Sequence, residues 1–480
     1  MTTPHPSPAP SATVPAATTP PAKRLFGTDG VRGLANVEPV TAETALKLGR
    51  AAAHVIMQVG RREGRANDRP LVVLGKDTRQ SGYMLENALA AGLMSLGADV
   101  FLLGPLPTPG VAFITRTLRA DVGIVLTASH NPYEDNGIKF FHYDGYKLDD
   151  DIERRIEGLV FSGEIEAIRP TAGKIGRAKR IDDALARYVE FAKTSFSRSR
   201  KLTLEGMRIA VDAANGAAYK STPWILRELG ADVLTFHNAP DGTNINRDCG
   251  STYPDEIALL VRQTGAHFGI AHDGDADRCI LCDENGEIVD GDEIMAIAAT
   301  HYLKENRLAK DSLVATVMSN FGLDETVEAA GGRVIRTAVG DRYVIERMVR
   351  DDLNVGGEQS GHMIFREHTT TGDGVVTALQ ILRIITQTGQ ALGDLKKCLT
   401  KYPQAQRNLK VARKPPLTEL TEVQTLVQET EKALAGRGRV LLRYSGTEPK
   451  VRLLIEGRDQ AEIETQASRI ADALAQAIGA

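Results

Sequence analysis

A serine at the end of an apolar run is the first residue whose surroundings suggest chemistry. Ser129 lies in VLTASHNPYEDNGIKFF, residues 125–141, where β-branched residues give way to a polar stretch containing Asn131-Pro132. The run predicts a strand, and the polar stretch predicts a surface loop at the strand end, where open α/β sheets bind ligands. Ser129 is therefore a candidate nucleophile. An isolated S-H-N-P segment would serve equally well to satisfy the backbone groups of a turn.

His130 is the group that a hydrolase would use to activate this serine. Adjacent side chains of an extended segment point to opposite faces, and the sequence contains no G-x-S-x-G nucleophile elbow. We therefore expect His130 to orient the loop instead of acting as the base.

Three aspartates alternate with small residues in HDGDADR, residues 272–278. In an extended loop, Asp273, Asp275 and Asp277 would all project to one side, and such hard oxygen ligands suit Mg²⁺. An EF-hand is excluded because Arg278 stands where that loop requires glycine. A solvated acidic turn would have to hold a proton, since three close carboxylates repel one another. The spacing therefore favours a magnesium site.

Three glycine-containing loops carry groups that could bind an anion or a sugar. The stretch RYSGTEPKVR offers a guanidinium, hydroxyls and exposed amides, a combination that suits a phosphate group. In GGEQSGH, two side chains could hydrogen-bond adjacent sugar hydroxyls. In FGTDGVRG, an arginine could support a phosphoryl group or cap a turn. The candidate residues of these loops are Arg443, Ser445, Gly446 and Thr447, then Glu358, Ser360 and His362, then Arg32.

The elements around these loops repeat along the chain. Residues 71–103, 208–236 and 312–340 each run from a strand-like segment through a polar loop to a helical pattern, a glycine and a second strand-like segment. Each segment predicts a βαβ unit, and the apolar strands predict buried, mostly parallel sheets. Three such units predict three similar α/β domains with mixed, mostly parallel sheets.

The last part of the chain has a different pattern. After residue 403 a helix, two strands and a final helix predict a smaller C-terminal α+β domain. Residues 1–22 contain seven prolines and no Asp, Glu, Lys or Arg, which predicts a disordered tail. The predicted domains are 23–178, with the serine; 179–288, with the aspartates; 289–402, for the sugar; and 403–480, for the phosphate.

Composition limits the partners and the compartment. The chain has 480 residues with 62 acidic and 58 basic side chains, so no basic field is available for nucleic acid. Four cysteines are too few for a disulfide framework, and the N-terminus lacks a signal peptide, which favours a cytoplasmic protein. No apolar run reaches the roughly 20 residues that cross a bilayer, so we expect no membrane association.

The ordered set of motifs resembles the α-D-phosphohexomutase superfamily from about residue 24 to 475. The resemblance rests on FGTDGVRG, TASHNPYEDNGIKFF, DGDADR, GDRYV, GGEQSGH, TTGDG and RYSGTEPK. Members of this superfamily have four domains around a central cleft, the first three sharing one topology. The resemblance therefore implies the domain organisation that the repeats predict.

The resemblance also implies roles for single residues. Ser129 would be a phosphoserine, required for activity, that donates its phosphoryl group to a sugar phosphate and takes one back. One Mg²⁺ would be bound by its phosphate oxygen together with Asp273, Asp275 and Asp277. Lys139 would be the general acid/base, with a pKa lowered by Mg²⁺ and nearby arginines. Arg278 would contact the phosphoryl group.

The sugar-binding loop also resembles one group of members. Gln359, between Glu358 and Ser360, matches the enzymes that interconvert glucosamine 6-phosphate and glucosamine 1-phosphate, and supply UDP-N-acetylglucosamine and cell-wall precursors. Their bisphosphate intermediate must turn end for end, while the loop of Arg443 grips the phosphate that is not transferred. Ala276 and Tyr444 are mild departures from the superfamily pattern. Phosphomannomutase or phosphoglucomutase activity and a non-catalytic sugar-phosphate sensor are the alternatives, and a homodimer is the expected assembly.

Overall fold

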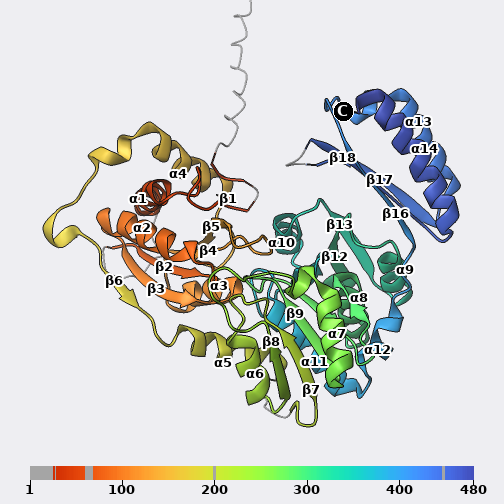
Figure 1. The fold of residues 1–480 in the computed structure, drawn as a ribbon, viewed down its shortest axis with the longest axis horizontal. Coiled ribbons are helices and arrows are strands. Elements are labelled where there is room, and N and C mark those ends of the chain that lie inside the picture. Colours follow the sequence, from red (N-terminus) through yellow and green to blue (C-terminus); the bar gives the residue numbers. More distant parts are fainter. Residues whose placement is uncertain (1–24, 28, 60–68, 198–201, 446–448, 480) are drawn as a thin grey trace, which may run out of the picture.

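The computed structural model describes residues 25–27, 29–59, 69–197, 202–445 and 449–479 (Figure 1). The predicted tail, residues 1–22, lies outside these ranges. Four sheets follow one another along the chain, and the first three are mixed α/β sheets. This organisation confirms the predicted fold class of three α/β domains and a C-terminal α+β domain. None of the helices in the described ranges qualifies as a membrane span by length and hydropathy.

The first sheet has six strands, and helices cover both of its faces. Val72 and Leu74 of β2 pack with α1, α2 and α4, whereas Leu71 and Val73 pack with α3 on the opposite face. Burial on both faces explains why the strand is a continuous apolar run. In sheet order the strands are β1 (Val31–Leu34), β5 (Asp135–His142), β4 (Val122–Leu126), β2 (Leu71–Lys76), β3 (Asp99–Pro105) and β6 (Ala178–Arg180). The helices are α1 (Ala42–Val59), α2 (Ser81–Ser95), α3 (Thr108–Thr117) and α4 (Asp150–Ser162).

The second and third sheets repeat this plan. The three predicted βαβ units are confirmed, because β2 and β3, β7 and β8, and β12 and β13 each form a parallel pair joined through a helix. The second sheet contains β11 (Ile288–Val289), β10 (Cys279–Cys282), β9 (Phe268–His272), β7 (Arg208–Asp212) and β8 (Asp232–Phe236), with α6 (Ser221–Glu228) and α7 (Pro254–Thr264). The third contains β13 (Arg333–Thr337), β12 (Ser312–Thr316), β14 (Val355–Gly357) and β15 (Met363–Phe365), with α8 (Gly291–Lys304), α9 (Gly322–Ala329), α10 (Asp341–Arg350), α11 (Gly374–Thr388) and α12 (Leu392–Leu395).

A single buried cluster joins these three domains. It includes Val73 and Val111 of the first domain, Ile270 of the second and Leu379 of α11, together with Tyr188 of α5 (Ala184–Phe196). Strand β6 pairs with β3 of the first sheet, so the boundary predicted at residue 178 falls at the first residue of this strand. The domain boundaries stay predictions.

The fourth domain has its own core. Helices α13 (Thr421–Ala433) and α14 (Gln460–Ile478) pack on an antiparallel sheet ordered β16 (Gln404–Lys410), β18 (Lys450–Gly457), β17 (Gly438–Tyr444) (Figure 1). The prediction of two strands was wrong, because β16 is a third. Its sequence, QAQRNLK, is mainly polar, and Ala405 is the residue that it buries completely. The apolar alternation that identifies a strand is therefore weak.

Candidate active site

Loops from three domains meet at the carboxyl ends of parallel strands. Ser129 follows β4, the three aspartates follow β9, and Glu358 follows β14. The Ser129 hydroxyl donates a hydrogen bond of 2.6 Å to Asp273 Oδ2, which joins the first and second domains at the predicted nucleophile. The two motifs are far apart in the sequence, but the fold brings them into direct contact.

Ser129 is buried, with 2% of its surface exposed. The prediction of a surface loop was therefore wrong. Its backbone has φ 51°, in the left-handed region, so the prediction of an extended segment was also wrong. As a result, His130 does not point to the opposite side, and its Nδ1 lies 3.4 Å from the serine Oγ. Burial, with Arg278 and Arg32, lowers the pKa of His130 to about 4, so its imidazole is neutral at pH 7.

The three aspartates converge as predicted, although the backbone differs from the prediction. They lie in a turn in which Ala276 has φ 57°, not in an extended loop. One ligand atom from each of Asp273, Asp275 and Asp277 lies within 4.8 Å of the others, and all three side chains are buried. Burial and the charges of the other two carboxylates raise the pKa of Asp273 well above its usual value.

These carboxylates fit a divalent cation. The Oδ1 atoms of Asp275 and Asp277 are buried and accept no hydrogen bond from the described part of the chain. The second oxygen of Asp275 accepts a bond of 2.8 Å from Thr108 Oγ1, which holds this carboxylate in place. Oxygen atoms that face one another without a donor are the ligands that hard cations prefer.

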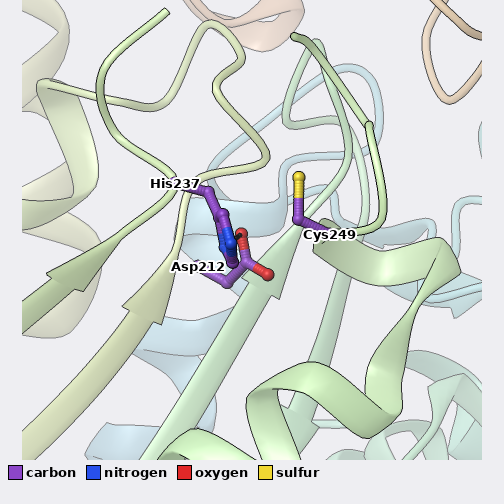
Figure 2. A group of neighbouring side chains, drawn as sticks. All are labelled: Asp212, His237 and Cys249. Atoms are coloured by element: carbon purple, nitrogen blue, oxygen red, sulfur yellow. Dashed lines mark ion pairs between the residues drawn. The ribbon is translucent and has the colours of Figure 1, made fainter.

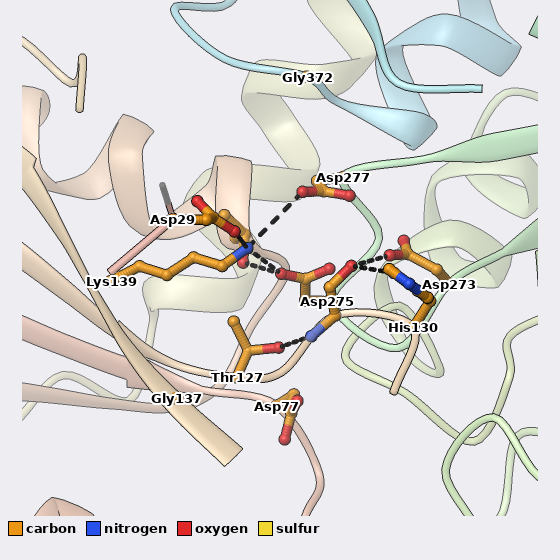
Figure 3. Close-up of polar contacts among 12 residues, drawn as sticks. Asp29, Asp77, Thr127, His130, Gly137, Lys139, Asp273, Asp275, Asp277 and Gly372 are labelled. Atoms are coloured by element: carbon orange, nitrogen blue, oxygen red, sulfur yellow. Dashed lines mark hydrogen bonds and ion pairs between the residues drawn. The ribbon is translucent and has the colours of Figure 1, made fainter. Parts of the chain in front are cut away.

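Lys139 of β5 lies among the same carboxylates. Its Nζ lies 2.9 Å from Asp29 Oδ2, 3.3 Å from Asp275 Oδ2 and 3.9 Å from Asp277 Oδ2 (Figure 3). Burial acts to lower the pKa of Lys139, but the charges of Asp275, Asp29 and Asp277 raise it above its usual value. The predicted lowering requires bound Mg²⁺, so it stays a prediction; without a cation, Lys139 is an ammonium.

Both predicted arginines lie near the serine loop. Their charges both act to lower the pKa of His130. Arg278 is half-buried; its backbone N–H donates to Asp273 Oδ1 at 3.2 Å, and its Nε lies 3.8 Å from Asp277 Oδ1. Arg32 binds Asp29 with an Nη2–Oδ2 distance of 3.1 Å, which restrains its own loop.

The third-domain loop comes close to the aspartates through His362. Its Nδ1 lies 3.6 Å from Asp277 Oδ2. Burial acts to lower the pKa of this imidazole, but the charges of Asp277, Asp341 and Glu358 raise it to about 9. Glu358 accepts a hydrogen bond of 3.1 Å from the backbone of Gly340, and burial raises its pKa. Ser360 is exposed. The sugar-binding roles of these residues stay predictions.

The fourth-domain loop is described only in part. Gly446 and Thr447 lie outside the described residues, so the phosphate site also stays a prediction. Arg443 of β17 stands opposite Arg452 of β18, and burial together with the Arg452 charge lowers its pKa. Ser445 is buried. Two neighbouring guanidinium groups favour the binding of an anion.

Asp29, Asp341 and Lys147 were not singled out from the sequence as site residues. Lys147 Nζ lies 2.7 Å from Asp29 Oδ1 and 2.7 Å from Asp341 Oδ2, so it connects the first and third domains. Both aspartates lie in motifs that carry the resemblance, FGTDGVRG and GDRYV. The signal was therefore present in the sequence, but only the fold shows that Lys147 pairs with both.

A second group of potential metal ligands lies in the second domain. Single atoms of Asp212, His237 and Cys249 lie within 4.8 Å of one another (Figure 2). Both Asp212 oxygens already accept backbone hydrogen bonds, from Ala214 at 2.9 Å and Gly250 at 2.7 Å. His237 Nδ1 lies 3.1 Å from Asp212 Oδ1, and burial raises the pKa of the Cys249 thiol to about 12. An internal ion pair that fastens a loop accounts for this group.

Comparison with known protein families agrees with this geometry. Four domain models of the phosphoglucomutase/phosphomannomutase family match the chain: alpha/beta/alpha domains I, II and III at residues 23–166, 186–286 and 290–402, and the C-terminal domain at 407–473. The chain belongs to this family.

Individual relatives cover nearly the whole chain. A phosphoglucosamine mutase of Syntrophotalea carbinolica is 54% identical over 457 residues, which are 95% of this chain and 98% of the relative. One from an Anaeromyxobacter species is 55% identical over 462 residues, which are 95% of this chain and 97% of the relative. This family member therefore shares more than half of its residues with proteins of that name.

Solved structures of family proteins have the same fold. A phosphoglucomutase/phosphomannomutase family protein of Burkholderia thailandensis superposes with a TM-score of 0.78 at 23% identity, covering 94% of this chain and 97% of that one. The Aspergillus fumigatus N-acetylphosphoglucosamine mutase, solved in complex with GlcNAc-6P and magnesium, gives a TM-score of 0.63 at 18% identity, covering 95% and 96%. These likenesses confirm the four-domain architecture.

Proposed function

We propose that this protein is a phosphoglucosamine mutase, an isomerase that interconverts glucosamine 6-phosphate and glucosamine 1-phosphate. The contact of 2.6 Å between Ser129 Oγ and Asp273 carries the proposal of phosphoryl transfer, because it places a nucleophile at a set of cation ligands. The substrate is supported by the relatives named phosphoglucosamine mutase at 54% and 55% identity. Gln359 in the sugar-binding loop supports the same substrate.

In this proposal Ser129 carries a phosphoryl group on Oγ. O1 or O6 of the sugar attacks the phosphorus, the bond from phosphorus to Ser129 Oγ breaks, and a sugar bisphosphate forms. The bisphosphate turns, its other phosphoryl group returns to Ser129, and the isomerised monophosphate leaves. Phosphoryl transfer depends mainly on positioning and on neutralised charge, which the buried site and its arginines supply.

The surrounding residues divide the remaining tasks. Mg²⁺ bound by Asp273, Asp275 and Asp277 would neutralise charge on the phosphoryl group and offset the carboxylates that raise the pKa of Lys139. Lys139 is our candidate to accept the proton of the attacking hydroxyl and return it. Arg278 and Arg32 are proposed to contact the phosphoryl group, and His130 to orient the loop. Glu358, Ser360 and His362 are proposed to bind the sugar. The second phosphate is proposed to be held by Arg443, Ser445, Gly446 and Thr447.

Coupled assays with glucosamine, glucose and mannose phosphates test the substrate. We expect the highest kcat/KM with glucosamine phosphate. The name of the family favours glucose or mannose phosphates as the second candidate. Turnover of glucose 1-phosphate far above that of glucosamine 1-phosphate would overturn the substrate proposal. No turnover of any of the three would favour a sugar-phosphate sensor.

We also propose a cytoplasmic homodimer that supplies amino sugar for UDP-N-acetylglucosamine and cell-wall precursors. The small number of cysteines and their mainly buried, unpaired state suit a reducing compartment. Sedimentation of the purified protein tests the assembly, and a monomeric mass at working concentration would contradict it.

A further inference from the structure

We propose that Arg79 and Asn246 are positioning residues for catalysis: together they hold the Ser129 loop in its reactive conformation by binding its backbone carbonyl groups. We call this pair the carbonyl clamp. The inference rests on the proposed phosphoryl transfer at Ser129, and neither residue belongs to the predicted sugar, phosphate or cation contacts.

The conformation of Ser129 needs support from its surroundings. A φ of 51° is unfavourable for a residue with a side chain, because Cβ comes too close to the backbone. Such conformations persist where neighbouring groups hold them, and they concentrate at functional sites. The backbone N–H of Ser129 donates to Thr127 Oγ1 at 2.9 Å, so the carbonyl side of the loop requires a separate anchor.

Arg79 supplies the first half of the clamp. Its Nη2 donates to the carbonyl oxygens of Ser129 at 2.9 Å and Asn131 at 2.8 Å. Its Nη1 donates to the carbonyl oxygens of Pro132 and, at 3.1 Å, Asp135. One guanidinium therefore binds four carbonyl groups between Ser129 and the first residue of β5, Asp135. The planar fork of donors on arginine makes this arrangement feasible, whereas a lysine ammonium could not reproduce it.

Asp77 fixes the guanidinium. Arg79 Nε donates to Asp77 Oδ2 at 2.9 Å, and the Arg79 backbone N–H donates to Asp77 Oδ1 at 2.9 Å. Neither side chain has any exposed surface. A buried charge pair of this kind holds one geometry only where its remaining donors and acceptors are satisfied. The four loop carbonyls satisfy the remaining donors of Arg79.

Asn246 supplies the second half from the other domain. Its Nδ2 donates to the carbonyl oxygens of Ser129 and Asn131, each at 2.9 Å. These two carbonyl groups therefore each accept one bond from the first domain and one from the second. Gly274 allows this approach, because a Cβ there would lie 2.7 Å from the Ser129 carbonyl oxygen.

The loop that carries Asn246 is itself fastened at both ends. The Asn246 backbone N–H donates to Ala214 O at 2.9 Å. The loop begins near His237, whose Nδ1 lies 3.1 Å from Asp212 Oδ1 (Figure 2), and it ends near Gly250, whose backbone N–H donates to Asp212 Oδ2 at 2.7 Å. The amide of Asn246 therefore belongs to a rigid support. The ion pair of Asp212 and His237 stabilises this loop, because it fixes the end of the loop at His237 to the end of β7.

The clamp determines where the serine hydroxyl points. With both carbonyl groups held on one side, Ser129 Oγ reaches Asp273 at 2.6 Å. A displacement of about 1 Å in a reacting group can cost about 100-fold in rate. Loss of the clamp should therefore lower kcat. It should leave KM nearly unchanged, because the clamp residues bind the serine loop and not the sugar.

Asn246→Ala and the isosteric Asn246→Asp test the proposal. We expect a fall of about 100-fold in kcat, with KM changed by less than about twofold. Transfer of a phosphoryl group from glucosamine 1,6-bisphosphate to dephosphorylated protein, measured in a single turnover, should slow by the same factor. The matched control is Asn244→Ala, which removes two side-chain bonds in the same loop, one donated to Ala239 O and one accepted from the Asp241 backbone N–H; no hydrogen bond joins the Asn244 side chain to Ser129. This control should retain the parent kcat.

Arg79→Lys provides an independent test from the first domain, because it keeps the charge beside Asp77 and loses the fork. We expect it to lower kcat at constant KM as well. Folded Asn246 variants with the parent kcat and the parent single-turnover rate would overturn the clamp and leave the proposed function intact. Loss of turnover through unfolding of these variants, seen by circular dichroism, would also overturn it, since the role would then be structural. A parent protein without mutase activity would refute both proposals.

Discussion

The repulsion among the three buried aspartates gives a prediction in which stability and function move in opposite directions. Asp273→Asn removes one negative charge and keeps the shape of the side chain and an oxygen for the 2.6 Å Ser129 bond, while its amide nitrogen replaces the acceptor of the longer, 3.2 Å bond from the Arg278 backbone N–H. The ligand atoms of the three aspartates lie within 4.8 Å of one another, and two unit charges at that limit repel by about 3 kcal/mol at an effective dielectric constant of about 20. Asp273 faces two such neighbours, and Arg278 offsets part of their effect.

Proton binding reduces this penalty, because the pKa of Asp273 is raised well above its usual value. We therefore expect Asp273→Asn to stabilise the metal-free protein by about 1–3 kcal/mol, less than the full repulsion. Mg²⁺ at 100 times its dissociation constant should stabilise the parent by about 2.7 kcal/mol, and the variant by much less. The variant should also lose turnover.

Thermal unfolding in chelator and in Mg²⁺ measures both effects. Asp212→Asn is the matched control, because this buried aspartate is paired with His237 and not with other carboxylates. It should lower stability in both conditions and keep the parent response to Mg²⁺. Lower stability of Asp273→Asn than of the parent in chelator would contradict repulsion among the aspartates, and equal stabilisation of variant and parent by Mg²⁺ would contradict the cation site.

Three further changes test other parts of the structure. Ser129→Ala should abolish turnover and, because Ser129 is buried and bound to Asp273, lower stability by about 1 kcal/mol in thermal unfolding; residual mutase activity would contradict its role. Arg443→Ala should raise KM more than it lowers kcat, and an unchanged KM in steady-state assays would contradict the phosphate grip. Burial raises the pKa of Asp292 to about 7, so the cost of its charge is absent below the unfolded pKa of about 4 and complete above about 7. The free energy of unfolding of Asp292→Asn should therefore rise by about 2–4 kcal/mol relative to that of the parent as pH rises from 4 to about 8. A difference in unfolding free energy that stays constant across that range would contradict the raised pKa.

The sequence predicts those features that depend on local pattern. Apolar runs followed by helical patterns identify the three βαβ units, because strands covered on both faces must be continuously apolar. The alternation of Asp273, Asp275 and Asp277 predicts converging carboxylates although the backbone there is a turn. In both cases the residues responsible are neighbours in the chain.

The features that were mispredicted depend on partners distant in sequence. Ser129 is buried and left-handed because Gly274 and Asn246 of the second domain close over its loop, and nothing in the local S-H-N-P segment indicates this. The contact of Asp29 with Lys139, which raises the pKa of the lysine in the absence of a cation, was not predicted, because Asp29 approaches only when the first sheet is assembled. The sequence around each residue does not contain this information.

The central claim is that Ser129 carries a phosphoryl group during turnover. Glucosamine 1,6-bisphosphate labelled in its phosphate groups, rapid quenching and peptide mapping measure this directly. We predict that label appears on Ser129 at a rate no slower than kcat and leaves again when unlabelled glucosamine 6-phosphate is added. Label that never reaches Ser129, or reaches it more slowly than product forms, would contradict the claim.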